Sequence, residues 1–250
     1  MVQNYPNFLS LSEINLIKDG VYDLKQYWKH SSQYRNSGLL PYKDTPIIEV
    51  LRDQYKAEYL LGDPLYRLEG HKEDITLGTQ FALLEKFYWL YTKTINKITE
   101  ITSIESELEP DLTIPGFHVY ASHPQPFNEF KYHTDVSIVD YYPNLDINKI
   151  YSFVILIESK GTTPYLEYET GPTKSSSFST HGSGPANSII INTNSGVPAT
   201  EEYQLGSLHI WEAKLSHRIG GFELKEGDSR ITFQGHYYYD PETKTNKLFF

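Results

Sequence analysis

The tetrapeptide Tyr132-His133-Thr134-Asp135 places an imidazole and a carboxylate two residues apart. On an extended backbone both side chains project from one face, because side chains alternate across a strand with a period of two. On a helix they would point about 200° apart, at about 100° per residue. The flanking runs Phe117-His118-Val119-Tyr120 and Val136-Ser137-Ile138-Val139 are rich in β-branched and aromatic residues, which favours strands. The sequence therefore predicts a two-ligand site for a divalent metal.

A third ligand is needed, because a His-x-Asp pair alone also occurs as a loop carboxylate beside a partly buried histidine. His217 supplies a candidate, at the end of the run that starts with Gly206-Ser207-Leu208-His209-Ile210-Trp211. Two histidines and one carboxylate leave the opposite face of a metal open, which is the arrangement of non-haem Fe(II) oxygenases. We therefore expect His133, Asp135 and His217 to bind one metal ion.

The segment after His217 carries a second signal, a cation beside a hydroxyl. Turn residues such as Gly220 and Gly227 allow the chain to fold back, which would bring Arg230 near His217. Arg230 and Thr232 lie two residues apart on a predicted strand and so face the same way. A guanidinium pairs with two carboxylate oxygens, and the hydroxyl adds a hydrogen bond. This pair is a candidate anchor for a dicarboxylate.

Taken in order, these motifs resemble the Fe(II)/2-oxoglutarate-dependent dioxygenases, whose core is a double-stranded β-helix. The resemblance covers residues 112 to 239. It consists of Tyr120 on a strand, the His-x-Asp motif, a Gly-x-Leu-x-x-Trp strand from Gly206, the distal His217, and Arg230-x-Thr232.

The resemblance implies a role for each of these residues. His133, Asp135 and His217 would be the Fe(II) ligands. Arg230 would bind the distal carboxylate of the cosubstrate 2-oxoglutarate, with Thr232 and Tyr120 as its hydrogen-bonding neighbours. The implied reaction consumes dioxygen, converts 2-oxoglutarate to succinate and carbon dioxide, and hydroxylates an unactivated C–H bond. In the family, halogenating members have a small residue where this chain has Asp135, so the resemblance favours hydroxylation.

The first part of the chain has the pattern of helices. Ser10-Leu11-Ser12-Glu13 has the spacing of a capping box, with Gly20 as the expected stop, and Thr45-Pro46 is a typical start of a second helix. A longer helix is expected from Thr79 to Glu100. Its apolar stripe would pack on the outside of the β core; the stripe comprises Leu83, Phe87, Leu90, Tyr91, Ile95 and Ile98.

From Leu112 onwards the pattern changes to short strands separated by turns. Strands are predicted at 151–157, 164–169, 188–192 and 208–211. We therefore expect a mainly β protein with N-terminal α structure, built as a double-stranded β-helix (jelly-roll) core flanked by helices. Residues 1–250 would form a single domain, with 1–111 as a mainly helical scaffold and 112–250 as the catalytic core.

Composition excludes several classes of function. A formal charge of -10 opposes binding to phosphate backbones, so nucleic acid is not an expected partner. With no cysteine, neither a disulfide framework nor a thiolate metal site is available. The N-terminus lacks the basic and apolar regions of a signal peptide, and no apolar run approaches about 18 residues, so we expect a cytoplasmic protein that does not enter a membrane.

The substrate is the least determined feature. A polar run between Thr170 and Pro198 is either a plain surface insertion or a loop that covers the site. As a cover it would suit a small polar molecule, and we expect an amino acid or a compound derived from one. The alternatives are a hydroxylase of peptide or protein side chains, a β-barrel protein that uses the same ligands with another metal and no oxygenase chemistry, and a binding module with a degenerate site. The remaining histidines are expected to be ordinary polar residues: His30, His71, His118, His123, His181, His209 and His236.

Overall fold

The fold is mainly β-sheet with few helices, as the sequence predicts. The computed structural model describes residues 2–27, 29–30, 58–60, 78–110, 112, 114–120, 132–140, 142, 144–161, 163–170, 173–179, 188–194, 197–220 and 227–250. The helical elements are α1 (Leu11–Asp23), α4 (Gly78–Thr102) and the 3-10 turns η1 (Lys25–Tyr27), η2 (Ser137–Asp140) and η3 (Ile147–Lys149).

The strands form a large sheet, a small sheet and a separate hairpin. The large sheet has the order β1-β11-β6-β13-β5-β3-β2, with β14 beside β13 and β4 beside β14. The small sheet has the order β10-β7-β12, and β8 pairs with β9. Their bounds are β1 (Gln3–Tyr5), β2 (Lys29–His30), β3 (Glu58–Leu60), β4 (Ser106–Leu108), β5 (Gly116–Tyr120), β6 (Ile150–Lys160), β7 (Tyr165–Thr170), β8 (Thr173–Ser179), β9 (Ser188–Asn194), β10 (Val197–Glu202), β11 (Leu208–Glu212), β12 (His217–Gly220), β13 (Ser229–Asp240) and β14 (Thr245–Phe249).

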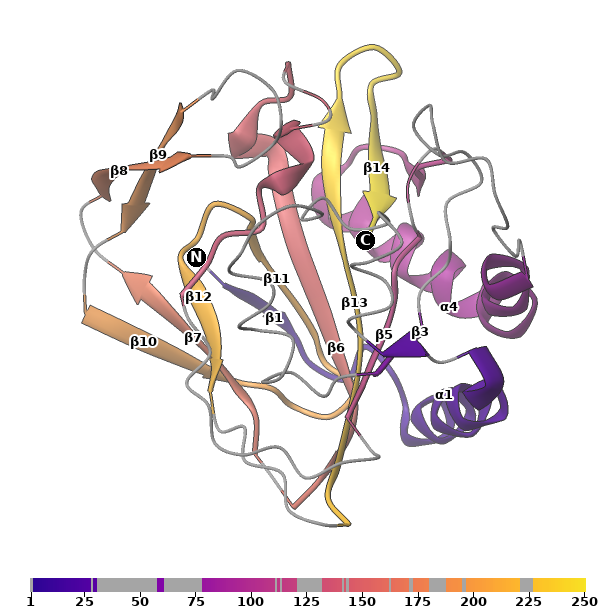
Figure 1. Ribbon diagram of the computed structural model, residues 1–250. Coiled ribbons are helices and arrows are strands. Elements are labelled where there is room, and N and C mark those ends of the chain that lie inside the picture. The colour runs from indigo at the N-terminus through magenta and orange to yellow at the C-terminus, as the bar shows by residue number, and fades with distance from the viewer. Residues whose placement is uncertain are drawn as a thin grey trace.

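Helices α1 and α4 lie on one side of the large sheet, and strands β7, β10 and β12 lie on the other (Figure 1). The helix-facing side of the sheet is apolar, because alternate residues of its strands, such as Ile231 and Phe233, join the main core cluster. The stripe predicted on the long helix packs here, with Leu83 and Leu90 fully buried. The prediction that this helix covers the outside of the β core is therefore confirmed.

The opposite side of the large sheet is more polar. It carries Arg230 and Thr232 from β13, Ser152 from β6 and His209 from β11, and all four side chains are at most 1% exposed. Residues directly opposite one another on paired strands share a face, so the pairs Trp211↔Ser152 and His209↔Val154 extend this surface across the sheet. The candidate functional residues therefore lie between the large and the small sheet.

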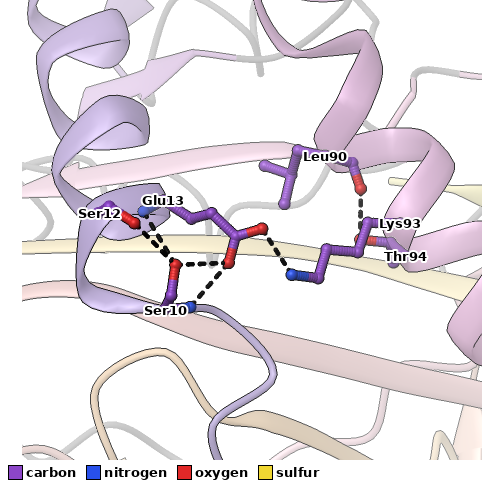
Figure 2. A network of polar contacts seen from close by, with 6 residues as sticks. All are labelled: Ser10, Ser12, Glu13, Leu90, Lys93 and Thr94. Atoms are coloured by element: carbon purple, nitrogen blue, oxygen red, sulfur yellow. Dashed lines mark hydrogen bonds and ion pairs between the residues drawn. The ribbon is translucent and has the colours of Figure 1, made fainter.

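Helix α1 begins with the predicted capping box. The Glu13 backbone N–H donates to the Ser10 hydroxyl, and the Ser10 backbone N–H donates to the Glu13 carboxylate over 2.7 Å. The same carboxylate accepts from Lys93 of α4 over 2.6 Å, so one side chain both caps α1 and joins it to α4 (Figure 2).

Gly20 does not end helix α1, contrary to the prediction, because the helix continues to Asp23. A Cβ at this position would lie 2.8 Å from Cε1 of Phe87, so the glycine is needed for the close approach of α4. The predicted strand at 136–139 is also wrong, because η2 forms there with a hydrogen bond from the Val139 N–H to the Val136 carbonyl. Local apolar and β-branched composition did not distinguish a buried 3-10 turn from a strand.

The predicted strands at 151–157, 164–169, 188–192 and 208–211 are confirmed as β6, β7, β9 and β11. The helix expected to start at Thr45-Pro46 lies outside the described residues. The start of the chain is not only helical, because β1 pairs with β11. None of the helices in the described part of the chain combines the length and the apolarity that crossing a membrane requires.

The contact under Gly20 can be tested by adding one methyl group. Alanine is about 1 kcal/mol more favourable than glycine inside a helix, but overpacking a core typically costs about 1–3 kcal/mol. We expect Gly20→Ala to lower the free energy of unfolding by about 1 kcal/mol in urea denaturation, because the methyl would overlap the Phe87 ring. In a Phe87→Leu background the same change should cost less. Equal losses in both backgrounds would contradict the close approach.

Candidate metal centre

The two candidate histidine ligands are held together by their own backbones. The His133 N–H donates to the His217 carbonyl and the His217 N–H donates to the His133 carbonyl, each over 2.9 Å. The Asp135 N–H donates to the Ala213 carbonyl over 2.8 Å. These bonds tie the segment that follows β5 to the start of β12, and the two imidazole ring centroids lie 4.5 Å apart. The pair thus lies between strands β5 and β6, with His133 in an isolated β-bridge to His217.

The ligand atoms have the spacing of a metal site. Nε2 of His133 lies 3.6 Å from Oδ1 of Asp135, and Nε2 of His217 lies 3.4 Å from Oδ2 of the same carboxylate. All three ligand atoms lie within 4.8 Å of one another. Two ligands about 2.1 Å from a metal and about 90–120° apart would be about 3.0–3.6 Å from each other. The residues therefore fit a divalent cation bound by two imidazoles and one carboxylate.

The protonation states of His217 and Asp135 also suit the binding of a cation. Nδ1 of His217 lies 2.9 Å from the Leu215 carbonyl, and since a carbonyl only accepts, Nδ1 carries the proton and Nε2 keeps its lone pair toward Asp135. Burial, only partly opposed by the Asp135 carboxylate, lowers the pKa of His217 to about 4. Burial alone would raise the pKa of Asp135, but His217, the other nearby histidines and Ser152 hold it at about 2. At neutral pH the carboxylate is ionised and the His217 imidazole is neutral.

A hydrogen-bonded pair behind the site orients the carboxylate. The Ser152 hydroxyl donates to Oδ2 of Asp135 over 2.7 Å, and Nδ1 of His236 lies 3.0 Å from the same hydroxyl oxygen. Because the serine proton is committed to the carboxylate, Nδ1 of His236 must be the donor. The sequence interpretation treated His236 as an ordinary polar residue and did not consider Ser152. Neither lies near Asp135 in sequence, so only the pairing of β6 with β13, which sets Ser152 opposite His236, reveals them.

A second polar cluster lies next to the backbone bridge between the two histidines. It contains the residues adjacent to them in sequence, Tyr132 and Arg218. Arg218 donates from Nη2 to Oε1 of Glu167 over 2.8 Å, and the Tyr132 hydroxyl donates to the same oxygen. The Arg218 guanidinium also lies 4.8 Å from the centre of the Tyr132 ring. The hydrogen bond from Tyr132, together with Arg218, lowers the pKa of Glu167. The residue before His133 and the residue after His217 are thus joined through β7.

The candidate cosubstrate residues lie on strands β5 and β13 of the large sheet. Arg230 is 1% exposed, and its guanidinium carbon lies 5.9 Å from the Tyr120 ring centre and 5.7 Å from the Tyr203 ring centre. Burial lowers the pKa of Arg230, although the two nearby tyrosines partly oppose this and raise it. Thr232 shares its face and donates to Oε1 of Gln234 over 3.2 Å. Arg230, Tyr120 and Thr232 are therefore on neighbouring paired strands, whereas Tyr203 was not anticipated.

His209 is buried on the same interior surface as the candidate site. Its ring is fully buried and packs edge-on against Tyr203, with 5.2 Å between ring centroids. Among the described residues neither ring nitrogen of His209 has a hydrogen-bond partner. Burial lowers the pKa of His209 to about 4, only slightly opposed by Glu201. The side chain of His30 is not described, and His71, His123 and His181 lie outside the described residues.

Comparisons with known proteins give distant structural neighbours. No protein-family model matches the sequence, and no curated protein matches it. Solved structures that are similar include an N-substituted L-amino acid dioxygenase of Burkholderia ambifaria in complex with alpha-KG, at 11% identity and a TM-score of 0.39 over 73% of this chain and 79% of that chain. A prolyl-4-hydroxylase of Pseudomonas putida has 11% identity and a TM-score of 0.44, over 95% and 91% of the two chains.

A third similar structure is a prolyl hydroxylase of Trichoplax adhaerens in complex with a peptide fragment of the hypoxia inducible factor oxygen degradation domain. It has 9% identity and a TM-score of 0.44, over 97% of this chain and 85% of that chain.

The role of Ser152 can be tested by removing its hydroxyl. Loss of a group that orients a metal ligand typically costs about 10–100-fold in metal affinity. We expect Ser152→Ala to weaken Co(II) binding by about tenfold or more in a competition titration. Ser106→Ala is a matched control, because Ser106 is a buried, hydrogen-bonded serine on β4 without contact to the candidate ligands. Equal affinities for the two variants would rule out a positioning role for Ser152.

Burial of His209 predicts a loss of stability in acid. Its folded pKa of about 4 lies below its unfolded value of 6.5, so the unfolded state binds the proton more readily. The stability contribution of neutral His209 is complete above about pH 6.5 and decreases as the pH falls, by about 2 kcal/mol between pH 7 and 5. Urea denaturation at these two pH values should show a drop in stability that is about 2 kcal/mol smaller in His209→Gln. A variant with the full wild-type drop would show that His209 does not titrate in this way.

Proposed function

We propose that this chain is an Fe(II)- and 2-oxoglutarate-dependent oxygenase with a double-stranded β-helix core, which hydroxylates a C–H bond of a small polar metabolite. The observation that carries the proposal is the convergence of His133, Asp135 and His217, with all ligand atoms within 4.8 Å of one another. Residues 1–111 would act as scaffold and 112–250 as the catalytic part of a single domain. Two histidines and one carboxylate leave coordination positions free for cosubstrate and dioxygen.

The chain itself supplies geometry and charge. His133, Asp135 and His217 would hold the iron, and the bridge between the two histidine backbones fixes their separation. The Leu215 carbonyl fixes the His217 tautomer, while Ser152 fixes the rotation of the Asp135 carboxylate. When bound, Fe(II) with 2-oxoglutarate and dioxygen supplies the oxidising power for C–H hydroxylation. The bulky carboxylate of Asp135 occupies the position that would otherwise be open to a halide, so we propose hydroxylation and not halogenation.

Arg230 is the proposed anchor for 2-oxoglutarate. It is buried on the interior surface, where a guanidinium costs free energy unless it binds polar or anionic groups. A carboxylate can satisfy the guanidinium with two parallel hydrogen bonds. Thr232 on the same strand and Tyr120 on the neighbouring strand are its proposed hydrogen-bonding neighbours. Arg218, the alternative cation, is less suitable because it donates to Glu167.

A small polar substrate is favoured by the β8–β9 hairpin and by charge. The hairpin leaves β7 after Thr170, two residues beyond Tyr168, and Tyr168 pairs with His217. It therefore starts at the end of the small sheet that carries a candidate ligand. Its sequence is rich in serine, threonine and asparagine, which provide neutral hydrogen-bonding groups. The net charge of -10 disfavours anionic polymers, and an amino acid or a related compound is the proposed substrate class.

The proposal is tested by turnover of 2-oxoglutarate after anaerobic loading with Fe(II). We expect succinate formation upon exposure to dioxygen, with release stimulated by one or more free amino acids and a gain of one oxygen atom in the product by mass spectrometry. A β-barrel metal protein without oxygenase chemistry would bind the ion but form no succinate. A degenerate binding module would bind metal weakly. Stimulation only by a peptide or an intact protein would favour the alternative hydroxylase.

The ligand assignment is tested with His133→Ala. The side chain of His133 is 51% exposed, so its removal should leave folding largely intact. Loss of one of three ligands should weaken metal binding by about 100-fold or more. This corresponds to about 2.8 kcal/mol of binding free energy, because each factor of ten is about 1.4 kcal/mol. Equilibrium dialysis with Fe(II) under argon and succinate assays measure binding and turnover. Ser106→Ala is again the control, because Ser106 lies on β4 and is not among the three ligands. Stoichiometric iron and full turnover in His133→Ala would refute the assignment.

A further inference from the structure

Tyr203 lies on the interior surface beside Arg230. The residue follows β10 and is 4% exposed. Its backbone N–H donates to the Pro164 carbonyl over 3.1 Å, which fixes the chain at the start of the side chain. The ring lies 5.7 Å from the Arg230 guanidinium carbon and packs edge-on against His209. A backbone hydrogen bond and ring packing therefore both fix the position of Tyr203.

Two charges act on the Tyr203 phenol. Burial raises its pKa, the Arg230 guanidinium lowers it, and the Asp135 carboxylate raises it again, with Arg230 the stronger of the two charges. The net pKa lies well above neutral pH, so the phenol stays protonated and can donate a hydrogen bond. The Arg230 guanidinium, 5.7 Å from the ring centre, therefore has the larger electrostatic effect on the phenol.

Tyr203 and Tyr120 both flank the Arg230 guanidinium, at similar distances of 5.7 Å and 5.9 Å. Tyr120 comes from β5, next to β13, whereas Tyr203 comes from the connection between β10 and β11. A carboxylate bound to the guanidinium would therefore have two phenol side chains nearby, from two different elements. Phenol O–H groups are neutral donors, so they strengthen anion binding without adding charge to a buried site.

On this basis we propose that Tyr203 is a carboxylate-binding residue that selects a dicarboxylic 2-oxo acid over a monocarboxylic one. The inference rests on the proposed function, because it assigns Tyr203 to the site where 2-oxoglutarate would bind. The phenol donates to the remote carboxylate, the one at the Arg230 end, and not to the carboxylate at the metal. The remote carboxylate is thereby recognised from two elements besides β13 itself.

The experiment compares two ligands that differ at the remote end only. 2-Oxoglutarate has a remote carboxylate, and 2-oxobutyrate lacks it. Both are titrated by calorimetry into the full chain loaded with Zn(II), which is redox-inert, so that binding is measured without turnover. Hydrogen bonds to charged groups are stronger than neutral ones. Tyr203→Phe should therefore weaken 2-oxoglutarate binding by about tenfold or more and change 2-oxobutyrate binding by less than about twofold.

Two reference variants make the result specific. Tyr237→Phe is the matched control, because Tyr237 is equally buried, at 3% exposed, but belongs to the helix-facing core cluster and stacks on Tyr151. It should leave the affinity for both ligands unchanged. Arg230→Met should weaken 2-oxoglutarate binding by more than Tyr203→Phe does, because it removes the charged donor.

A second measurement does not depend on the folding of a variant. 3-Fluorotyrosine at position 203 keeps the phenol and reports its surroundings by fluorine NMR. Its signal should shift when 2-oxoglutarate is added to the Zn(II) protein and should move far less with 2-oxobutyrate.

The outcomes separate this inference from the proposed function. If Tyr203→Phe binds 2-oxoglutarate as tightly as wild type, or loses both ligands equally, the carboxylate role of Tyr203 is wrong. A fluorine signal that does not respond to bound 2-oxoglutarate would contradict it too. If the wild-type Zn(II) protein binds no 2-oxoglutarate at all, the proposed function fails.

Discussion

The reciprocal backbone hydrogen bonds between His133 and His217 are the constraint on which the candidate site depends. They connect two segments that are far apart in sequence and set the two imidazoles side by side, 4.5 Å between ring centroids. Asp135 is placed by the same arrangement, through its N–H bond to Ala213. Backbone bonds are insensitive to side-chain chemistry, so the fold fixes the spacing of the ligands independently of any bound ion. The site is preorganised, which lowers the cost of binding a metal.

The two faces of the large sheet have different roles. One face packs in the apolar core, and the other carries the candidate functional residues. Its helix-facing side buries aromatic and aliphatic residues such as Phe117 and Phe233, whose rings are 5.1 Å apart. Its other side buries a guanidinium, an imidazole and hydroxyls, which cost free energy to remove from water. A protein keeps such groups inside when they serve a ligand or a network, and two groups of polar contacts are present on this face: Ser152 with His236 beside Asp135, and two tyrosines beside Arg230. Burial of the apolar face stabilises the fold and offsets the free-energy cost of burying polar groups on the other face.

Sequence patterns predicted those elements whose cause is local. The capping box of α1, the apolar stripe of α4 and the alternation in β13 each depend on residues a few positions apart, and all are present. The predictions that were wrong concern positions where a distant partner overrides the local preference. Gly20 looks like a helix stop but makes room for Phe87, and the apolar run after Asp135 forms a 3-10 turn.

The sequence by itself determined the nature of the candidate ligands and the strand that places Arg230 and Thr232 on one face. A period of two along a chain is a local property, and it needs no knowledge of the fold. Only the tertiary structure brought His217 to within 3.4 Å of Asp135, placed Ser152 and His236 beside that carboxylate, and placed Tyr203 beside Arg230. These three residues have no spacing relation to the motifs, because strand pairing and sheet stacking join positions at separations that no sequence period encodes.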